Sequence, residues 1–283
     1  MTITLIFINL PDLTIKSDTM KKIKMFFLFT FSFFLFLATC TEKVKEEKIP
    51  VTTSSEKAAE LYSEALGAGF DVEIAKANEL YTSAVEEDPD FLLPYYQMAI
   101  YDLYLGNMEN FREHAEKAVA IEAELSPGEE LLQEALGKWL EDPKADITET
   151  GNELVEMYPN DEQAYYFLAF CHYIAGNHKD QIETYKQALE IAEHKGAIYN
   201  SLGYAYMNLK NFEEAEKAFN TYIELEPDLP NPYDSKGDYY MAVEDYEKAT
   251  EHFMKAYEID TTWEVSYNKA LKAKAMLDSL KTE

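Results

Sequence analysis

Apolar side chains recur along this chain at the spacing of an α-helix, and the pattern is clearest in residues 196–229. In the first half of this stretch, apolar or small residues fall at i, i+3, i+4 and i+7, which lie on one face of a helix. After a break at residues 209–211 the pattern continues until Pro227, which ends a second helix. The residues on the two faces are Tyr199, Leu202, Gly203 and Tyr206, and then Phe212, Ala215, Phe219 and Tyr222. The stretch predicts two amphipathic helices joined by a short turn.

The same pattern returns at intervals of about 34 residues through most of the chain. One helix pair cannot bury its own apolar face, so the pairs are expected to stack. The predicted pairs occupy residues 58–91, 92–127, 128–161, 162–195, 196–229 and 230–263, and a helix over residues 264–281 caps the stack with its lysines on the outer face. The third pair is the most divergent, with Gly151 in place of an aromatic residue, although Ser126 and Glu129 predict a capping box at its start.

The order of residues in 196–229, aromatic, Leu-Gly, Tyr, Ala, Phe and Pro, resembles the tetratricopeptide repeat (TPR), and the other units keep parts of it. The resemblance covers residues 58–281 and implies an all-α, right-handed superhelical solenoid of about six TPR helix pairs with a C-terminal capping helix. Small residues are required where two helices cross closely. The residues assigned to packing within the repeats are Gly203, Ala215, Phe219, Gly237, Ala249 and Phe253.

Residues 20–40 have the pattern of an export signal, whereas residues 1–19 fit no part of one. Lys21, Lys22 and Lys24 precede an apolar run over residues 25–37, which is shorter than the roughly 20 residues that a membrane span needs. The ending of residues 37–40, Leu-Ala-Thr-Cys, resembles a bacterial lipobox, which implies that Cys40 is lipidated after cleavage before it. The alternative is an ordinary secretory signal with a chance cysteine. Residues 1–39 are thus interpreted as the signal, with the true start at Met20, and residues 40–57 as the lipidated cysteine and a polar tether.

This signal places the protein in a bacterial cell envelope, held by its lipid and facing the periplasm or the cell surface. Thr41, the residue after the cysteine, gives no reason for retention in the inner membrane, so the outer membrane is favoured.

The charge of the chain restricts its partners. The full chain has 25 basic and 53 acidic residues, and without residues 1–39, which hold four lysines and two aspartates, its net charge is −30. Such a surface repels phosphate backbones, so nucleic-acid binding is not expected.

Residue types that carry catalysis do not form a recognisable constellation. The five histidines show no spacing typical of metal ligands, and the acidic runs lack the pattern of a calcium loop. Cys171 lies in a helical pattern and is interpreted as a small buried residue. We therefore expect no metal, no cofactor and no enzymatic activity.

The face of each first helix that lies about 100° from its packing face is rich in aromatic and apolar residues. In the repeat family this face lines the concave groove. The candidate groove residues are Tyr62, Tyr96, Ile100, Trp139, Tyr166, Phe170, Tyr173, Asn200, Tyr204 and Met207. For any one of them, packing against a neighbouring repeat is an equally good interpretation. The face turns acidic in the sixth unit at Asp234 and Asp238. Members of the family that bind a peptide carboxylate use cations that are missing here, which disfavours such a ligand.

These observations favour a non-enzymatic protein–protein interaction scaffold, anchored to the envelope, that binds a protein or peptide segment in an aromatic groove. The partner is expected to be another envelope protein. Two alternatives remain open at this point, a glycan-binding lipoprotein and an accessory subunit of an envelope enzyme or secretion complex.

Overall fold

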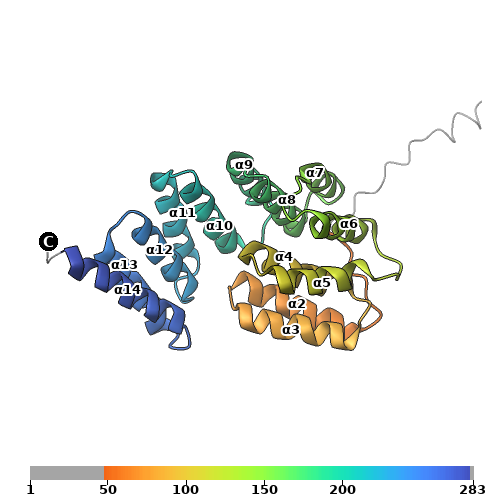
Figure 1. Cartoon of the computed structure of the whole chain (residues 1–283), viewed down its shortest axis with the longest axis horizontal. Helices are drawn as coiled ribbons and strands as arrows, with labels where there is room; N and C mark the ends of the chain where they lie inside the picture. The colour runs from red at the N-terminus through yellow and green to blue at the C-terminus, as the bar shows by residue number, and fades with distance from the viewer. Residues whose placement is uncertain (1–47, 281–283) are drawn as a thin grey trace, which may run out of the picture. The chain divides into compact units, whose positions relative to one another are not determined.

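The computed structural model describes residues 48–280. The export signal, Cys40 and the first part of the tether lie outside the described residues. All regular structure between residues 48 and 280 is helical (Figure 1). The helices are α2 (Glu56–Phe70), α3 (Ile74–Glu87), α4 (Leu92–Leu105), α5 (Met108–Val119), α6 (Pro127–Glu141), α7 (Thr148–Met157), α8 (Glu162–Ile174), α9 (His178–Ala188), α10 (Lys195–Asn208), α11 (Phe212–Leu225), α12 (Asn231–Ala242), α13 (Tyr246–Ile259) and α14 (Glu264–Leu280).

Consecutive helices pack as six pairs, from α2 with α3 to α12 with α13, and α14 packs on the last pair. The predicted fold class, an all-α solenoid of about six helix pairs with a capping helix, is therefore confirmed. None of the helices described is long and apolar enough to cross a membrane.

The turn inside five of the six pairs contains one residue with a left-handed backbone. In the first two pairs these residues lie 34 positions apart, and in the last three pairs they are again spaced by 34 positions. Gly106 and Gly176 have φ of 75° and 73°, a conformation that glycine adopts without strain. Non-glycine residues take the same place in the other turns: Val72, Lys210 and Glu244, with φ of 60°, 56° and 62°. The repeat spacing thus fixes the turn conformation even where glycine is absent.

Close packing inside the fifth and sixth pairs depends on glycine. A Cβ on Gly203 would lie 2.4 Å from the Phe219 ring, and a Cβ on Gly237 would lie 2.5 Å from the Phe253 ring. Ala215 and Ala249, which were assigned to the same packing, are fully buried. The second helix of each pair can approach the first only because these positions carry no larger side chain.

The third pair departs from this arrangement. Its first helix begins with the predicted capping box, in which the Ser126 and Glu129 side chains each bind the other residue's backbone amide. Its second helix, α7, packs more extensively on α8 than on α6. The reason is Gly151, since a Cβ there would lie 2.9 Å from Leu168 of α8. The missing aromatic residue lets the fourth pair come closer.

Part of the segment interpreted as a polar tether lies instead along the solenoid. Residues 48–54, called the strap from here on, run from the fourth pair back to the first. The Ile49 amide donates to Asp161 at 2.7 Å, and the Thr52 amide donates to Glu129 at 3.0 Å. The Ser54 amide donates to Asp88 at 2.7 Å. The chain is therefore bound to the helices from Lys48 onward, because three carboxylates accept its backbone amides.

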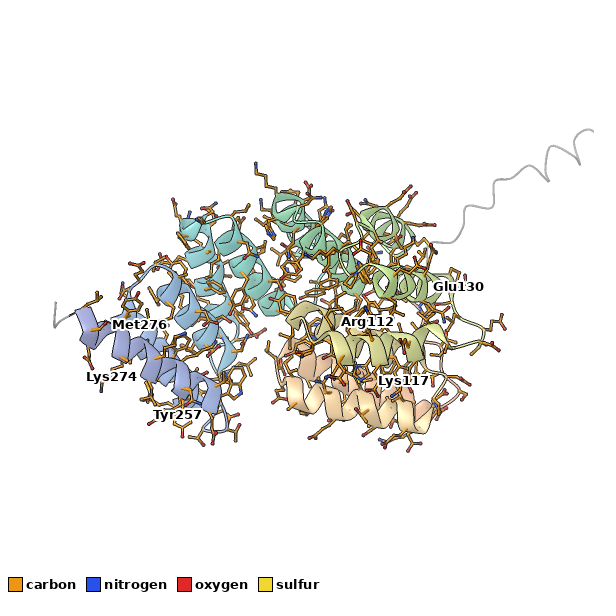
Figure 2. All side chains as sticks on the ribbon, viewed as in Figure 1. Arg112, Lys117, Glu130, Tyr257, Lys274 and Met276 are labelled. Carbon is orange, nitrogen blue, oxygen red and sulfur yellow. The ribbon has the colours of Figure 1, made fainter. Side chains whose placement is uncertain are left out.

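The capping helix also differs from its expected form. Lys274 (Figure 2) is exposed, as predicted for an outer face, and so is Lys272. Lys269, in contrast, turns inward and forms ion pairs with Asp234 at 2.6 Å and Asp238 at 2.9 Å. The acidic face of the sixth unit is thus paired with a lysine of the cap, because two carboxylates so near the core need a cation.

Candidate functional site

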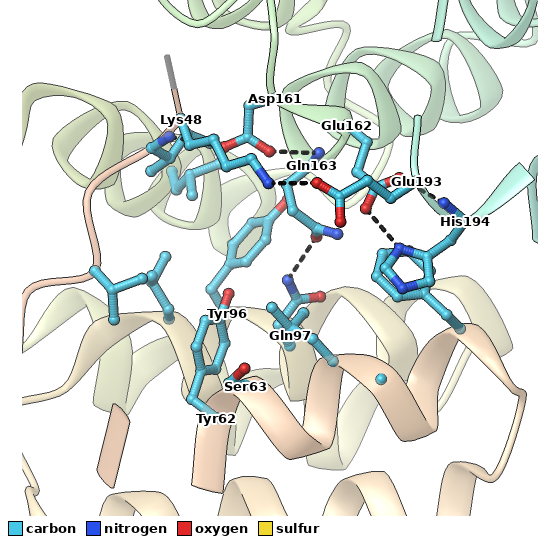
Figure 3. A pocket seen from close by; sticks show the side chains of 17 residues that line it. Lys48, Tyr62, Ser63, Tyr96, Gln97, Asp161, Glu162, Gln163, Glu193 and His194 are labelled. Carbon is cyan, nitrogen blue, oxygen red and sulfur yellow. Dashed lines mark hydrogen bonds and ion pairs between the residues drawn. The ribbon is translucent and has the colours of Figure 1, made fainter. Parts of the chain in front are cut away.

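Two adjoining cavities lie between helix pairs that are distant in the sequence, each of about 340 Å³. The outer cavity is bounded by the strap, α2, α4 and the first residues of α8 (Figure 3). The aromatic cavity is bounded by α2, α3, α4, α8, α9 and α10. The residues that line both are Leu66, Phe70, Tyr96, Gln97 and Gln163. The two spaces therefore share a wall at the centre of the first four pairs.

The cavities form because the first pair contacts the start of α10. Phe70, at the end of α2, stacks on His194 with a centroid distance of 3.9 Å and lies 5.8 Å from the Tyr166 ring. His194 is fixed by Glu162, whose carboxylate lies 2.7 Å from its Nδ1 atom. Gln97 of α4 donates to Gln163 of α8 at 3.1 Å (Figure 3). These contacts close the space between the first and fourth pairs.

The lining of the aromatic cavity is uncharged, although the chain as a whole is strongly acidic. The aromatic residues in it are Phe70, Tyr81, Tyr96, Tyr101, Tyr104, Tyr166, Phe167, Phe170 and Tyr185. The polar residues in it are Asn78, Gln97, Gln163, Asn200 and Ser201, and no acidic or basic residue is among the described residues that line it. Such a site favours a ligand with apolar surface and neutral polar groups.

The tyrosines of this cavity remain neutral at physiological pH. Burial raises the pKa of Tyr81, Tyr96 and Tyr166 well above the ordinary value, because a phenolate loses hydration inside the protein. Burial also raises the pKa of Tyr185 to about 12, although hydrogen bonds with Ser201 and Gln181 oppose the shift. The cavity can therefore offer hydroxyl groups to a ligand without gaining charge.

Two polar atoms at the aromatic cavity are buried without a hydrogen bond. They are the Tyr166 hydroxyl oxygen and Asn200 Oδ1, and neither has a partner among the described residues. A buried polar group left unpaired costs about 1–3 kcal/mol. A ligand that supplies hydrogen-bonding groups at these two atoms would recover that cost.

The structure distributes the ten predicted groove residues over four places. Tyr96, Ile100, Tyr166, Phe170 and Asn200 line the aromatic cavity, and Tyr62 lines the outer cavity with Tyr96. Tyr173 packs beside the aromatic cavity, with its ring 5.4 Å from Tyr104 and 6.1 Å from Phe170.

The remaining three predicted groove residues lie away from both cavities. Trp139 is fully buried, with its ring against Phe167 and Phe170. Tyr204 donates to Asp238 at 3.0 Å and packs on Phe219, and Met207 joins the core of the last pairs. Their places are corrected from groove to packing, because the neighbouring helices cover them.

Several lining residues escaped the sequence interpretation. Tyr81 and Tyr185 lie on second helices, where only packing was expected. Tyr185 precedes Phe219 by 34 residues, and Phe253 follows at the same interval. The same position carries Tyr81 in the first pair, Ala115 in the second and Gly151 in the third. A tyrosine there, in the first and fourth pairs, is the signal that a cavity with polar character lies at this position. Phe70, Tyr101 and Tyr104 carry no comparable signal.

Comparison with known proteins identifies the helix pairs. Family models described as tetratricopeptide repeat match residues 152–198, 196–229 and 231–262. Residues 152–262 carry tetratricopeptide repeats. The second match coincides with the fifth predicted unit, and the third differs from the sixth by one residue at each end. A search of curated proteins returned no match.

Solved structures, two of them described as TPR proteins, resemble the chain at low identity. A thermophilic TPR protein of Thermus thermophilus is 16% identical, with 78% of this chain and 98% of that chain covered and a TM-score of 0.47. YrrB, a TPR protein described as having an unusual peptide-binding site, is 19% identical over 69% and 97% of the two chains, with a TM-score of 0.42. MamA is 20% identical over 59% and 90%, with a TM-score of 0.40.

Chemically reactive groups are few in the part of the chain that the structure describes. Between residues 48 and 280, no three His, Cys, Asp or Glu side chains are grouped so that they could hold a metal ion. Burial raises the pKa of the Cys171 thiol well above its ordinary value, which suppresses the reactive thiolate. The described residues thus show neither a grouped set of metal ligands nor an activated cysteine.

Proposed function

We propose that this chain is a non-enzymatic scaffold that binds an uncharged segment of a partner protein in the aromatic cavity. The observation that carries the proposal is the uncharged aromatic lining with two buried polar atoms unpaired. Aromatic side chains supply large apolar contact area, and a peptide segment supplies amide groups for Tyr166 and Asn200. The repeats support a protein or peptide partner, since stacked helix pairs serve widely as binding surfaces.

Tyr104 offers the sharpest test of this site. Its side chain lines the cavity yet is 50% exposed, so truncation to alanine is expected to leave the free energy of unfolding within about 0.5 kcal/mol. Partner capture from detergent-solubilised envelope, quantified by mass spectrometry, should fall about tenfold, which corresponds to about 1.4 kcal/mol. Capture should persist in about 0.5 M salt, because the cavity is uncharged.

The matched control is Leu225→Ala. Leu225 is similarly exposed, at 48%, but lies at the end of α11 and outside both cavities. It should capture the partner as the unmodified chain does. Equal capture by the Tyr104 and Leu225 variants would contradict binding at the aromatic cavity.

The second part of the proposal is a lipid anchor in a bacterial envelope, with another envelope protein as the partner. It is supported by the sequence of residues 20–40, which ends in the lipobox-like Cys40. Cys40→Ala is expected to move the protein out of the membrane fraction, measured by fractionation and immunoblotting. Cys171→Ala, which changes the buried cysteine, should leave the protein in that fraction. A membrane-bound Cys40 variant would refute the anchor.

Glycan capture is the second candidate function. It is favoured by the amide side chains of Asn78, Gln97, Gln163 and Asn200, which lie beside aromatic rings in one uncharged cavity. Glycosidase treatment separates the two functions: a captured protein that survives the treatment supports peptide binding, and loss of capture supports glycan binding.

A further inference from the structure

The strap binds to three carboxylates that lie near the N-terminal ends of the first helices of three successive pairs. Asp161 is the N-cap of α8, Glu129 is the third residue of α6, and Asp88 follows α3 shortly before α4 begins. We call these three residues the carboxylate row. Each one accepts a backbone amide of the strap, and the Thr52 and Thr53 hydroxyls also donate to Glu129 and Asp88. The row therefore recognises an extended segment through its amides and hydroxyls.

The carboxylate row does not depend on the strap for its own position. The Gln163 amide donates to Asp161 at 2.9 Å, and the Ser126 amide donates to Glu129 at 2.9 Å. The Asp90 amide donates to Asp88 at 3.2 Å. Each carboxylate is thus oriented by a backbone amide that lies near the start of the same helix, α8, α6 or α4. If the strap left, the acceptors would stay in place as a preformed site for another extended segment.

The contacts that hold the strap are of a kind that a competitor can replace. Its ion pair, Lys48 with Glu193, has both side chains mostly exposed, at 65% and 71%, so it contributes little. Of its apolar side chains, Val51 is 47% exposed and Ile49 is partly buried against the core. The remaining bonds to the row come from amides and hydroxyls, which a second segment supplies one for one. Whether a second segment replaces the strap then depends on the further contacts that this segment makes with the protein.

The strap also forms a wall of the outer cavity through Lys48, Ile49 and Val51 (Figure 3). The outer cavity shares Tyr96, Gln97 and Gln163 with the aromatic cavity. Removing the strap would therefore widen the approach to the residues that line the proposed binding site. A segment seated on the carboxylate row would lie beside that approach.

We propose that the strap is a displaceable occupant of an extended-segment site on the carboxylate row, and that partner capture requires its release. The competing segment has the strap's chemistry: extended, uncharged over its central residues, and with adjacent threonine or serine hydroxyls. This inference rests on the proposed function, because it describes the regulation of the same cavity.

The test uses a labelled synthetic peptide of residues 46–57 and measures its binding by fluorescence anisotropy. In the unmodified chain the tethered strap competes at a high effective concentration, so the free peptide should bind weakly. The double variant Thr52→Val with Thr53→Val loses two of the three strap hydroxyls that donate to the carboxylate row and keeps that of Ser54. It should bind the free peptide at least tenfold more tightly than the unmodified chain.

Two controls define the result. A peptide with both threonines replaced by valine should bind the double variant at least tenfold more weakly than the natural peptide. Thr221→Val, which changes an exposed threonine bonded within α11, should bind the natural peptide like the unmodified chain. Equal binding of the natural peptide to the unmodified and double-variant chains would overturn the proposal, as would equal binding of the two peptides.

Hydrogen exchange in the full chain gives a second measurement that does not depend on the peptide. In the double variant, the amides of Ile49, Thr52 and Ser54 should exchange at least tenfold faster, while those of Ser126 and Gln163 keep their protection. Loss of protection at all five would show that the strap is a structural part of the repeats, which overturns the proposal. Tyr104→Ala should not change binding of the peptide to the carboxylate row. The experiments therefore distinguish a wrong assignment of the aromatic cavity from a wrong assignment of the strap.

Discussion

Replacing Trp139 with alanine is expected to lower the free energy of unfolding by about 3–5 kcal/mol, the usual cost of emptying a large buried aromatic site. Trp139 is fully buried in α6 and lies 5.3 Å from the Phe170 ring and 6.0 Å from the Phe167 ring, centroid to centroid. Its Nε1 atom donates to the Ala145 carbonyl at 3.2 Å, in the turn before α7. The substitution therefore removes core volume and leaves a carbonyl without its donor. Urea unfolding followed by far-UV circular dichroism measures the loss.

Trp263→Ala is the matched control, because the chain has only these two tryptophans. Trp263 lies in the turn before α14 and is partly exposed. Its replacement should cost about 1 kcal/mol, the typical value for a single substitution. If Trp139→Ala kept normal stability but lost partner capture, Trp139 would be a binding residue rather than a core residue.

The position of Trp139 shows why the groove could be predicted only in part. Counting along each first helix predicts groove positions on the assumption that every pair has the same neighbours. That assumption fails at the third pair, where Gly151 brings α8 close and places Phe167 and Phe170 against Trp139. Periodicity fixes which face of a helix is apolar, but it does not say what covers that face.

The helix pairs themselves were predictable because their signals are local. Helical spacing of apolar residues, small residues at crossings and a capping box each depend on residues within one unit. The closure of the cavities depends on Phe70 and His194, which lie in the first and fourth units, and no local pattern encodes their contact. The strap was missed for the same reason. Its polar sequence fits a tether, and only the folded chain brings Asp88, Glu129 and Asp161 beside it.

Charge on the capping helix gives a second contrast between local pattern and folded environment. Lysines on a terminal helix are usually solvated, and Lys274 agrees with that expectation (Figure 2). Lys269 instead contacts two carboxylates of α12, and Ser266 donates to Asp234 at 2.6 Å. The helix period places residues 266 and 269 on one face, so this face of α14 docks through polar contacts as well as through Ala270 and Ala273.

Lys269→Ala is accordingly expected to lower the free energy of unfolding by about 2 kcal/mol. Removal of one partner from a fully buried ion pair costs about 3–5 kcal/mol, and the 32% exposure of the Lys269 side chain lets water recover part of that. The variant leaves Asp234, whose side chain is 8% exposed, near Asp238 without a cation. Urea unfolding at about pH 7.5 measures the effect.

The pH dependence of the stability lost in Lys269→Ala identifies the interaction that is responsible. Burial raises the pKa of Asp238, and Lys269 opposes that shift, so the pKa should rise further in the variant. A carboxyl whose folded-state pKa exceeds its unfolded value takes up a proton on folding, and the associated stability is lost as pH rises through the folded pKa. The decrease in the free energy of unfolding caused by Lys269→Ala should therefore be smaller near pH 4.5 than at about pH 7.5. Lys274→Ala, on the exposed face of the same helix, should stay within about 0.5 kcal/mol of the unmodified chain at both pH values. An equal loss at the two pH values would mean that Lys269 holds α14 by packing of its aliphatic stem rather than by neutralising the two aspartates.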